Sequence, residues 1–109
     1  MIKVCVKRDK QNSIVEYRVT GHAGYDAHGR DVVCSAVSVL AQAAVIGLTR
    51  VVGIEVDYSI DDGDLYCVIP SLKGDSRREA DLILDTMFYT LENIREGYPG
   101  NILITETEV

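Results

Sequence analysis

A cysteine and a histidine twelve positions apart are the residues best suited to chemistry in this chain. Cys34 is the third residue of a long uncharged run, and His22 lies upstream in a glycine-rich segment. An imidazole beside a thiol can take its proton, hold the thiolate in place and later protonate an amine leaving group. The pair therefore fits a nucleophile, Cys34, with His22 as its general base. The spacing alone is also compatible with a histidine that faces solvent and with a cysteine whose thiol is buried and unreactive.

The expected position of Cys34 favours a reactive thiol. Residues 32–49 carry no charge, follow Asp31 and precede Arg50, an arrangement that suits the dipole of a helix. Unpaired backbone N–H groups in the first turn of a helix stabilise a thiolate. The N–H groups of Val33 and Cys34 are then candidates for an oxyanion hole.

Two polar residues flank the cysteine in the sequence. Asp31 could cap the helix or accept a hydrogen bond from His22, and capping is the simpler role. It should face away from the sulfur, because a carboxylate touching the thiol would raise its pKa. Ser38 follows Cys34 by one helical turn and shares its face, so its hydroxyl could bond the loop, a substrate or the carbonyl of Cys34.

Residues 21–31, GHAGYDAHGRD, have three glycines, two histidines and no helical or strand periodicity, so we expect a functional loop. A metal site built from Cys34, His22 and His28 is a weaker alternative, because it offers three ligands and no second cysteine pair. The other two thiols, Cys5 and Cys67, fall on expected strands and are expected to be buried.

The periodicity of the remaining sequence predicts how these residues are positioned. We expect strands at 2–7 and 14–19, a helix at 32–49, strands at 54–60 and 65–69 around an Asp-Gly turn, a helix at 76–96 and a strand at 101–107. The order β-β-α-β-β-α-β predicts a single α+β domain over residues 1–109, with one sheet and two helices packed on it.

Composition narrows the class of protein. A net charge of −6, from 17 acidic and 11 basic side chains, disfavours direct nucleic-acid binding and suits a basic partner. Three cysteines without a C-x-x-C pair argue against a disulfide framework and a zinc ribbon.

Two features bear on location. The first ten residues alternate apolar with polar positions and lack the apolar core of a signal peptide, so we expect a cytoplasmic protein. The uncharged run reaches the lower length limit of a membrane span, yet its serines, Gln42 and many alanines suit a core helix or a dimer interface better. We therefore expect no membrane association.

The segment GHAGYDAHGRDVVCSAVS resembles the bacterial ribosomal-processing cysteine protease family. The shared pattern is Gly-His-Ala, an aromatic residue, Gly-x-Asp, two aliphatic residues, Cys and a Ser four residues later. The matching positions are Gly21, His22, Ala23, Tyr25, Gly29, Asp31, Val32, Val33, Cys34 and Ser38. Outside this motif the similarity is one of pattern more than of identical residues.

The resemblance implies a catalytic dyad of Cys34 and His22, with Asp31 and Ser38 in support. It also implies a homodimer, no metal or other cofactor, and a flexible loop over the active site. The implied substrate is the precursor of a large-subunit ribosomal protein, whose short N-terminal extension is removed after an aromatic residue. Candidates for loop and substrate contacts are Gly21, Tyr25, Gly29 and also His28, which lies outside the shared pattern.

If substrate assembles the site, His22 and Cys34 should lie too far apart to bond in the free protein. The alternative from another functional class is a non-enzymatic ribosome-assembly or peptide-binding module, in which Cys34 is buried and unreactive.

Overall fold

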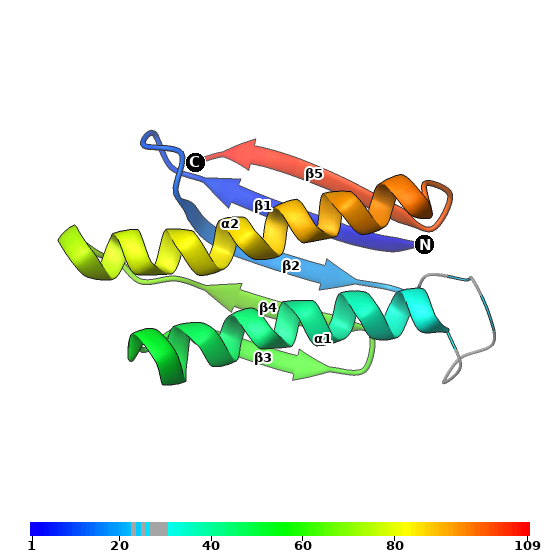
Figure 1. Cartoon of the computed structure of the whole chain (residues 1–109), viewed down its shortest axis with the longest axis horizontal. Coiled ribbons are helices and arrows are strands. Elements are labelled where there is room, and N and C mark those ends of the chain that lie inside the picture. The colour runs from blue at the N-terminus through cyan, green and yellow to red at the C-terminus, as the bar shows by residue number, and fades with distance from the viewer. Residues whose placement is uncertain (23, 25, 27–30) are drawn as a thin grey trace.

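The computed structural model describes residues 1–22, 24, 26 and 31–109, and it has the expected order of strands and helices (Figure 1). The elements are β1 (Ile2–Arg8), β2 (Ile14–Thr20), α1 (Val32–Ile46), η1 (Gly47–Val52), β3 (Asp57–Asp61), β4 (Asp64–Val68), α2 (Gly74–Gly97) and β5 (Ile102–Glu108). The prediction of an α+β fold with one sheet is confirmed.

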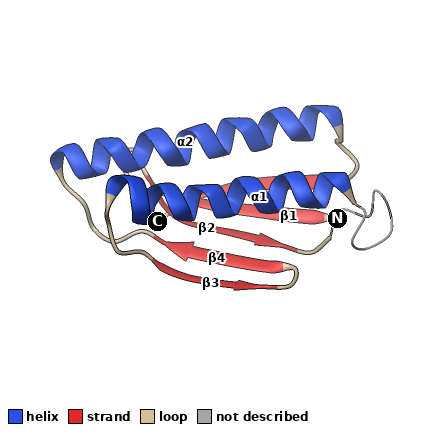
Figure 2. Ribbon diagram, turned by 60° about the horizontal axis from the view of Figure 1, so that its bottom comes forward, coloured by secondary structure: helices blue, strands red, loops and turns tan. Residues whose placement is uncertain are grey.

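The five strands form a sheet in the order β3-β4-β2-β1-β5. The pairs β1–β2 and β3–β4 are the two predicted antiparallel hairpins, and β5 joins β1 in parallel. Both helices cover the same face of this sheet (Figure 2). Strand β1 shows the consequence, since Ile2, Val4 and Val6 are buried while the residues between them are exposed.

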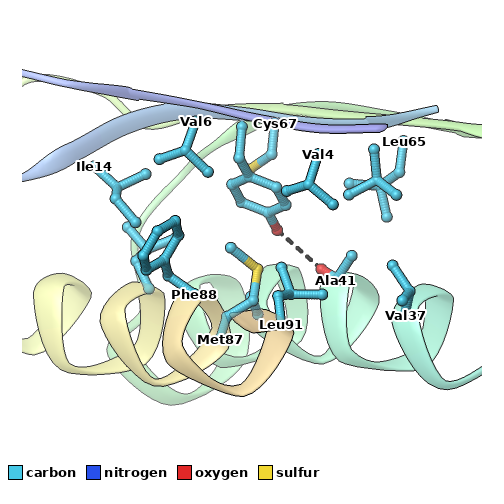
Figure 3. Close-up of a cluster of buried hydrophobic side chains, with 14 of the residues drawn as sticks. Val4, Val6, Ile14, Val37, Ala41, Leu65, Cys67, Met87, Phe88 and Leu91 are labelled. Carbon is cyan, nitrogen blue, oxygen red and sulfur yellow. Dashed lines mark hydrogen bonds between the residues drawn. The ribbon is translucent and has the colours of Figure 1, made fainter. Parts of the chain in front are cut away.

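The core lies between the sheet and the two helices. In Figure 3, Val4 and Val6 on the sheet face Met87, Phe88 and Leu91 on α2. Tyr17 of β2 is buried in this core, and it donates its hydroxyl to the carbonyl of Ala41 in α1 over 2.9 Å. This bond satisfies a polar group that would otherwise be costly to bury, and it ties α1 to the sheet.

The first helical segment is longer than predicted. It continues past Thr49 as a π-helix and ends at Gly53, which has a φ of +82° and donates its N–H to the carbonyl of Leu48. The uncharged run had suggested an end before Arg50, but this side chain is accommodated in the last turn. A left-handed glycine is a frequent helix stop, and it sets the true boundary.

Strand β3 correspondingly begins at Asp57 rather than at residue 54. The N–H of Ile54 donates to the carbonyl of Leu48 over 3.0 Å, so it is committed to the helix end and not to the sheet. All five residues of β3 are exposed, as suits a short strand at the sheet edge.

The helical segment Val32–Val52 is long and apolar enough, by length and composition, to cross a membrane, and it is the one such segment in the described parts of the chain. In the structure it packs on the sheet and α2 through buried residues that include Val33, Val37 and Ala41. Of its most apolar 18-residue window, 33% is buried, and the core helix of a folded domain can pass the same test of length and hydropathy.

Candidate functional site

Three elements meet at one end of the molecule. The end of β2, the start of α1 and the turn between β3 and β4 lie together there, as Figures 1 and 2 both show. They enclose a cavity of about 930 Å³. His22 reaches it from just beyond β2, Cys34 from the first turn of α1, and residues 61–64 from the turn.

The two residues expected to do chemistry are in contact. Sγ of Cys34 lies 3.7 Å from Nδ1 of His22, a hydrogen-bonding distance for sulfur. The prediction that the pair would be separated in the free protein is therefore wrong. The physical reason is a contact between distant segments, because the N–H of Gly21 donates to the carbonyl of Gly63 over 2.9 Å and fixes the chain immediately before His22.

Asp31 caps α1, as predicted. Its Oδ1 accepts the N–H of Cys34 over 3.0 Å, and its backbone carbonyl accepts the N–H of Ser35 over the same distance. Oδ2 accepts the N–H of Asp26, so both carboxylate oxygens bond backbone donors. The Asp31 side chain is buried, and it secures the residue that carries the thiol.

This cap changes one expectation about the oxyanion hole. The N–H of Cys34 cannot be offered freely to substrate, because the carboxylate of Asp31 already accepts it. The proposal of that N–H as an oxyanion donor is therefore wrong in this arrangement. Val33, one position earlier, keeps its place at the positive end of the helix dipole.

Ser38 lines the cavity one turn below Cys34. Its Oγ accepts a hydrogen bond from Nε2 of Gln42 over 2.9 Å, a partner that sequence reasoning missed. The spacing of four residues on a helix is the signal that could have found it. The pair forms part of the cavity wall on the α1 side.

The turn between β3 and β4 supplies an acidic rim that was predicted only as a turn. Asp61, Asp62 and Asp64 line the cavity. Arg18 forms two hydrogen bonds with Asp64, of 3.0 and 2.7 Å, and this bonding holds the pKa of that carboxyl below its usual range. The cluster of carboxylates in the sequence 61–64 was the available signal.

The other thiols differ from each other. Cys67 is buried, as expected, and burial raises its pKa to about 11. Cys5 was expected to be buried and is exposed, because its neighbours Val4 and Val6 occupy the core face of β1. Its sulfur accepts a hydrogen bond from the hydroxyl of Thr105 on β5.

No three histidine, cysteine or acidic side chains gather as a metal site within residues 1–22, 24, 26 and 31–109. His28, the third ligand of the metal alternative, lies outside the described residues, as do the substrate-contact candidates Tyr25 and Gly29.

Comparison with known proteins places the chain in a family. The model of the family described as cysteine protease Prp matches residues 1–103. The ribosomal processing cysteine protease Prp of Bacillus subtilis is 32% identical over 108 residues, which cover 96% of each chain.

Solved structures agree over almost the whole chain. The ribosomal processing protease Prp of Staphylococcus aureus, in complex with a covalently linked product peptide, matches with a TM-score of 0.89 and 28% identity, over 98% of this chain and all of that one. The same protease in complex with a substrate peptide matches with a TM-score of 0.82 and 26% identity, over the same shares. This chain therefore belongs to the Prp family of cysteine proteases.

Proposed function

We propose that Cys34 and His22 are the catalytic dyad of this protease, and that it removes the short N-terminal extension of a large-subunit ribosomal protein precursor. The observation that carries the proposal is the 3.7 Å contact between Sγ and Nδ1 at the cavity. The relative in Bacillus subtilis is named a ribosomal processing protease, and the Staphylococcus aureus structures hold substrate and product peptides.

Acylation would use both residues of the dyad. Nδ1 of His22 takes the proton from Cys34, and the thiolate attacks the carbonyl carbon of the scissile bond. The tetrahedral intermediate then collapses as His22 returns the proton to the departing amine. The C–N bond breaks, the mature protein leaves, and the extension remains on the sulfur as a thioester.

In deacylation, water is the nucleophile and the thiol of Cys34 is the leaving group. His22 takes a proton from water, the hydroxide attacks the thioester carbonyl, and the thiol of Cys34 leaves with the proton from the imidazole. In both halves a negative oxygen develops close to the N-terminus of α1. The positive end of the dipole of that helix would stabilise this oxygen, and we propose the N–H of Val33 as a further donor.

The cavity suits an extended peptide with an aromatic residue before the scissile bond. Its walls include apolar side chains from β1, β2, α1 and β4, namely Ile2, Val19, Val37 and Leu65. An aromatic ring would gain hydrophobic burial against such a wall. The acidic rim and the net charge of −6 suit a basic ribosomal protein.

We also propose a cytoplasmic location, because precursors of ribosomal proteins are made there.

We further propose that the enzyme is a homodimer that pairs through the outer face of α1. Val32, Val39 and Ile46 recur every seven residues and are more than half exposed. Ala36 and Ala43 fall between them and are exposed too. The stripe has the 3.5-residue period with which two helices pack, and a two-fold axis would place it against its own copy. Val39 also lines the cavity, so the partner would border the site.

The direct test of the proposed substrate is incubation of the purified protein with the ribosomal protein precursor of the same organism. Intact mass should show the loss of one N-terminal segment after an aromatic residue. A precursor with a scrambled extension is the matched control and should stay whole. Equal cleavage of the two precursors, or cleavage of neither, would contradict the proposed substrate.

A further inference from the structure

We propose that the turn between β3 and β4 positions His22 for proton transfer, and that Gly63 is the positioning residue. The inference rests on the proposed role of His22 as the general base. Gly63 lines the cavity beside the imidazole, and we place its effect on the reaction in the position of His22.

The turn first fixes the backbone before His22. In the sheet, Thr20 at the end of β2 pairs with Asp64 at the start of β4. The hydrogen bond from Gly21 to Gly63, at 2.9 Å, continues this pairing one step beyond both strands. A Cβ at Gly21 would lie 2.6 Å from the carbonyl oxygen of Met1, so this step requires glycine. The backbone immediately before His22 is therefore bonded to Gly63 on one side and lies close to the carbonyl of Met1 on another.

The turn also meets the imidazole ring itself. A Cβ built on Gly63 would lie 3.2 Å from Nε2 of His22 and 3.5 Å from Cε1. The other ring nitrogen, Nδ1, lies 3.7 Å from the sulfur of Cys34. The thiol therefore meets the ring at Nδ1, and a methyl group at position 63 would meet it closest at Nε2, the other nitrogen.

The chemistry is sensitive to such a shift. Proton transfer requires the donor and acceptor atoms to stay within hydrogen-bonding reach, and a misplacement of about 1 Å can cost about 10²-fold in rate. Asp61 and Asp62 of the same turn line the cavity, so the segment that borders the substrate also borders the base. Glycine at position 63 accordingly serves two needs, the positive φ of the turn and the close approach of His22.

Gly53 provides a matched control for the effect of a positive φ alone. Gly53 has a φ of +82°, close to the +73° of Gly63, but a Cβ at Gly53 would meet no atom within 4 Å. Gly53→Ala therefore introduces the backbone strain of a left-handed alanine alone. Gly63→Ala introduces the same strain and also the contact with His22. Gly53 ends η1 and does not line the cavity.

The experiment compares these two variants with the wild type and with His22→Ala. Steady-state cleavage of a precursor-derived peptide gives kcat and KM, and two-bond ¹H–¹⁵N spectra report the ring of His22. A Cβ contact of 3.2 Å requires the ring to move by a few tenths of an ångström, so we expect Gly63→Ala to lose kcat by several-fold to about 10-fold, with KM nearly retained and the ring signals shifted. Gly53→Ala should keep the wild-type kcat and ring signals, although both variants lose thermal stability.

Two results would overturn the inference. One is equal kcat in the two glycine variants, and the other is a loss in Gly63→Ala that falls on KM alone with unshifted ring signals. Full activity of His22→Ala would instead contradict the proposed dyad, so the two failures are distinguishable. Should the alanine variants not fold, Gly63→Asn and Gly53→Asn make the same comparison with less strain, because asparagine adopts positive φ more readily.

Discussion

The N–H of Cys34 donates to the carboxylate of Asp31 over 3.0 Å, so the residue that carries the thiol is bound by the cap of its own helix. Replacing Asp31 with alanine should destabilise the fold by about 1 kcal/mol, the usual value of an N-cap. Asp31→Asn should retain most of that stability, because the asparagine side-chain oxygen also caps. Urea unfolding of the two variants measures this difference, and equal losses would show that capping is not the role of Asp31.

The three thiols should react with iodoacetamide in a fixed order at neutral pH. Cys34 should be labelled first, because His22 can take its proton. Cys5 should follow although it is more exposed, and Cys67 should be labelled last because it is buried. Peptide mass after timed quenching gives the three rates.

The control for that order is His22→Ala. It should slow the labelling of Cys34 and leave the rate at Cys5 unchanged. Labelling of Cys34 no faster than Cys5 in the wild type would contradict activation by the imidazole.

Buried Cys67 makes the fold sensitive to alkaline pH. Burial raises its pKa from 9.0 to about 11, so between these values the unfolded chain loses a proton that the folded chain keeps. Stability is therefore fully present below pH 9 and falls on the way to pH 11, by on the order of 2 kcal/mol. Urea unfolding across this range should show a shallower decline in Cys67→Ala. If the free energy of unfolding fell equally in the wild type and in Cys67→Ala, Cys67 would not be the source of the pH dependence.

The proposed dimer should depend on the outer face of α1. Ile46 belongs to the exposed stripe and lies outside the cavity wall, so Ile46→Glu should place a charge at the interface without touching the site. Light scattering after gel filtration should show a dimer for the wild type and a monomer for this variant. Leu82→Glu, at an apolar position on α2 that is also more than half exposed, is the control that should stay dimeric. A monomeric wild type would contradict the proposal.

Much of the fold could be predicted from local patterns. The alternation of apolar and polar residues predicted β1 and β2 as a hairpin, and the Asp-Gly step at residues 62–63 predicted the second hairpin, whose glycine has a φ of +73°. The cap at Asp31 followed from the absence of charge after it. These features depend on neighbours in the chain, which is why a sequence reveals them.

The features that sequence reasoning missed depend on contacts between distant segments. The hydrogen bond from Gly21 to Gly63 joins two turns, and it brings His22 to Cys34 without substrate. The outward side chain of Cys5 follows from which face of the sheet the helices cover. The late start of β3 follows from a bond between Ile54 and Leu48 that no strand pattern contains.

Cys34 should form the covalent intermediate, and His22 should drive its formation. The most direct measurement is rapid quenching of the reaction with precursor, followed by intact mass and peptide mapping. A thioester between the released extension and Cys34 should appear before the free extension in the wild type, should form far more slowly in His22→Ala and should be absent in Cys34→Ala. Undiminished cleavage by Cys34→Ala, or a covalent adduct on another residue, would show that Cys34 is not the nucleophile.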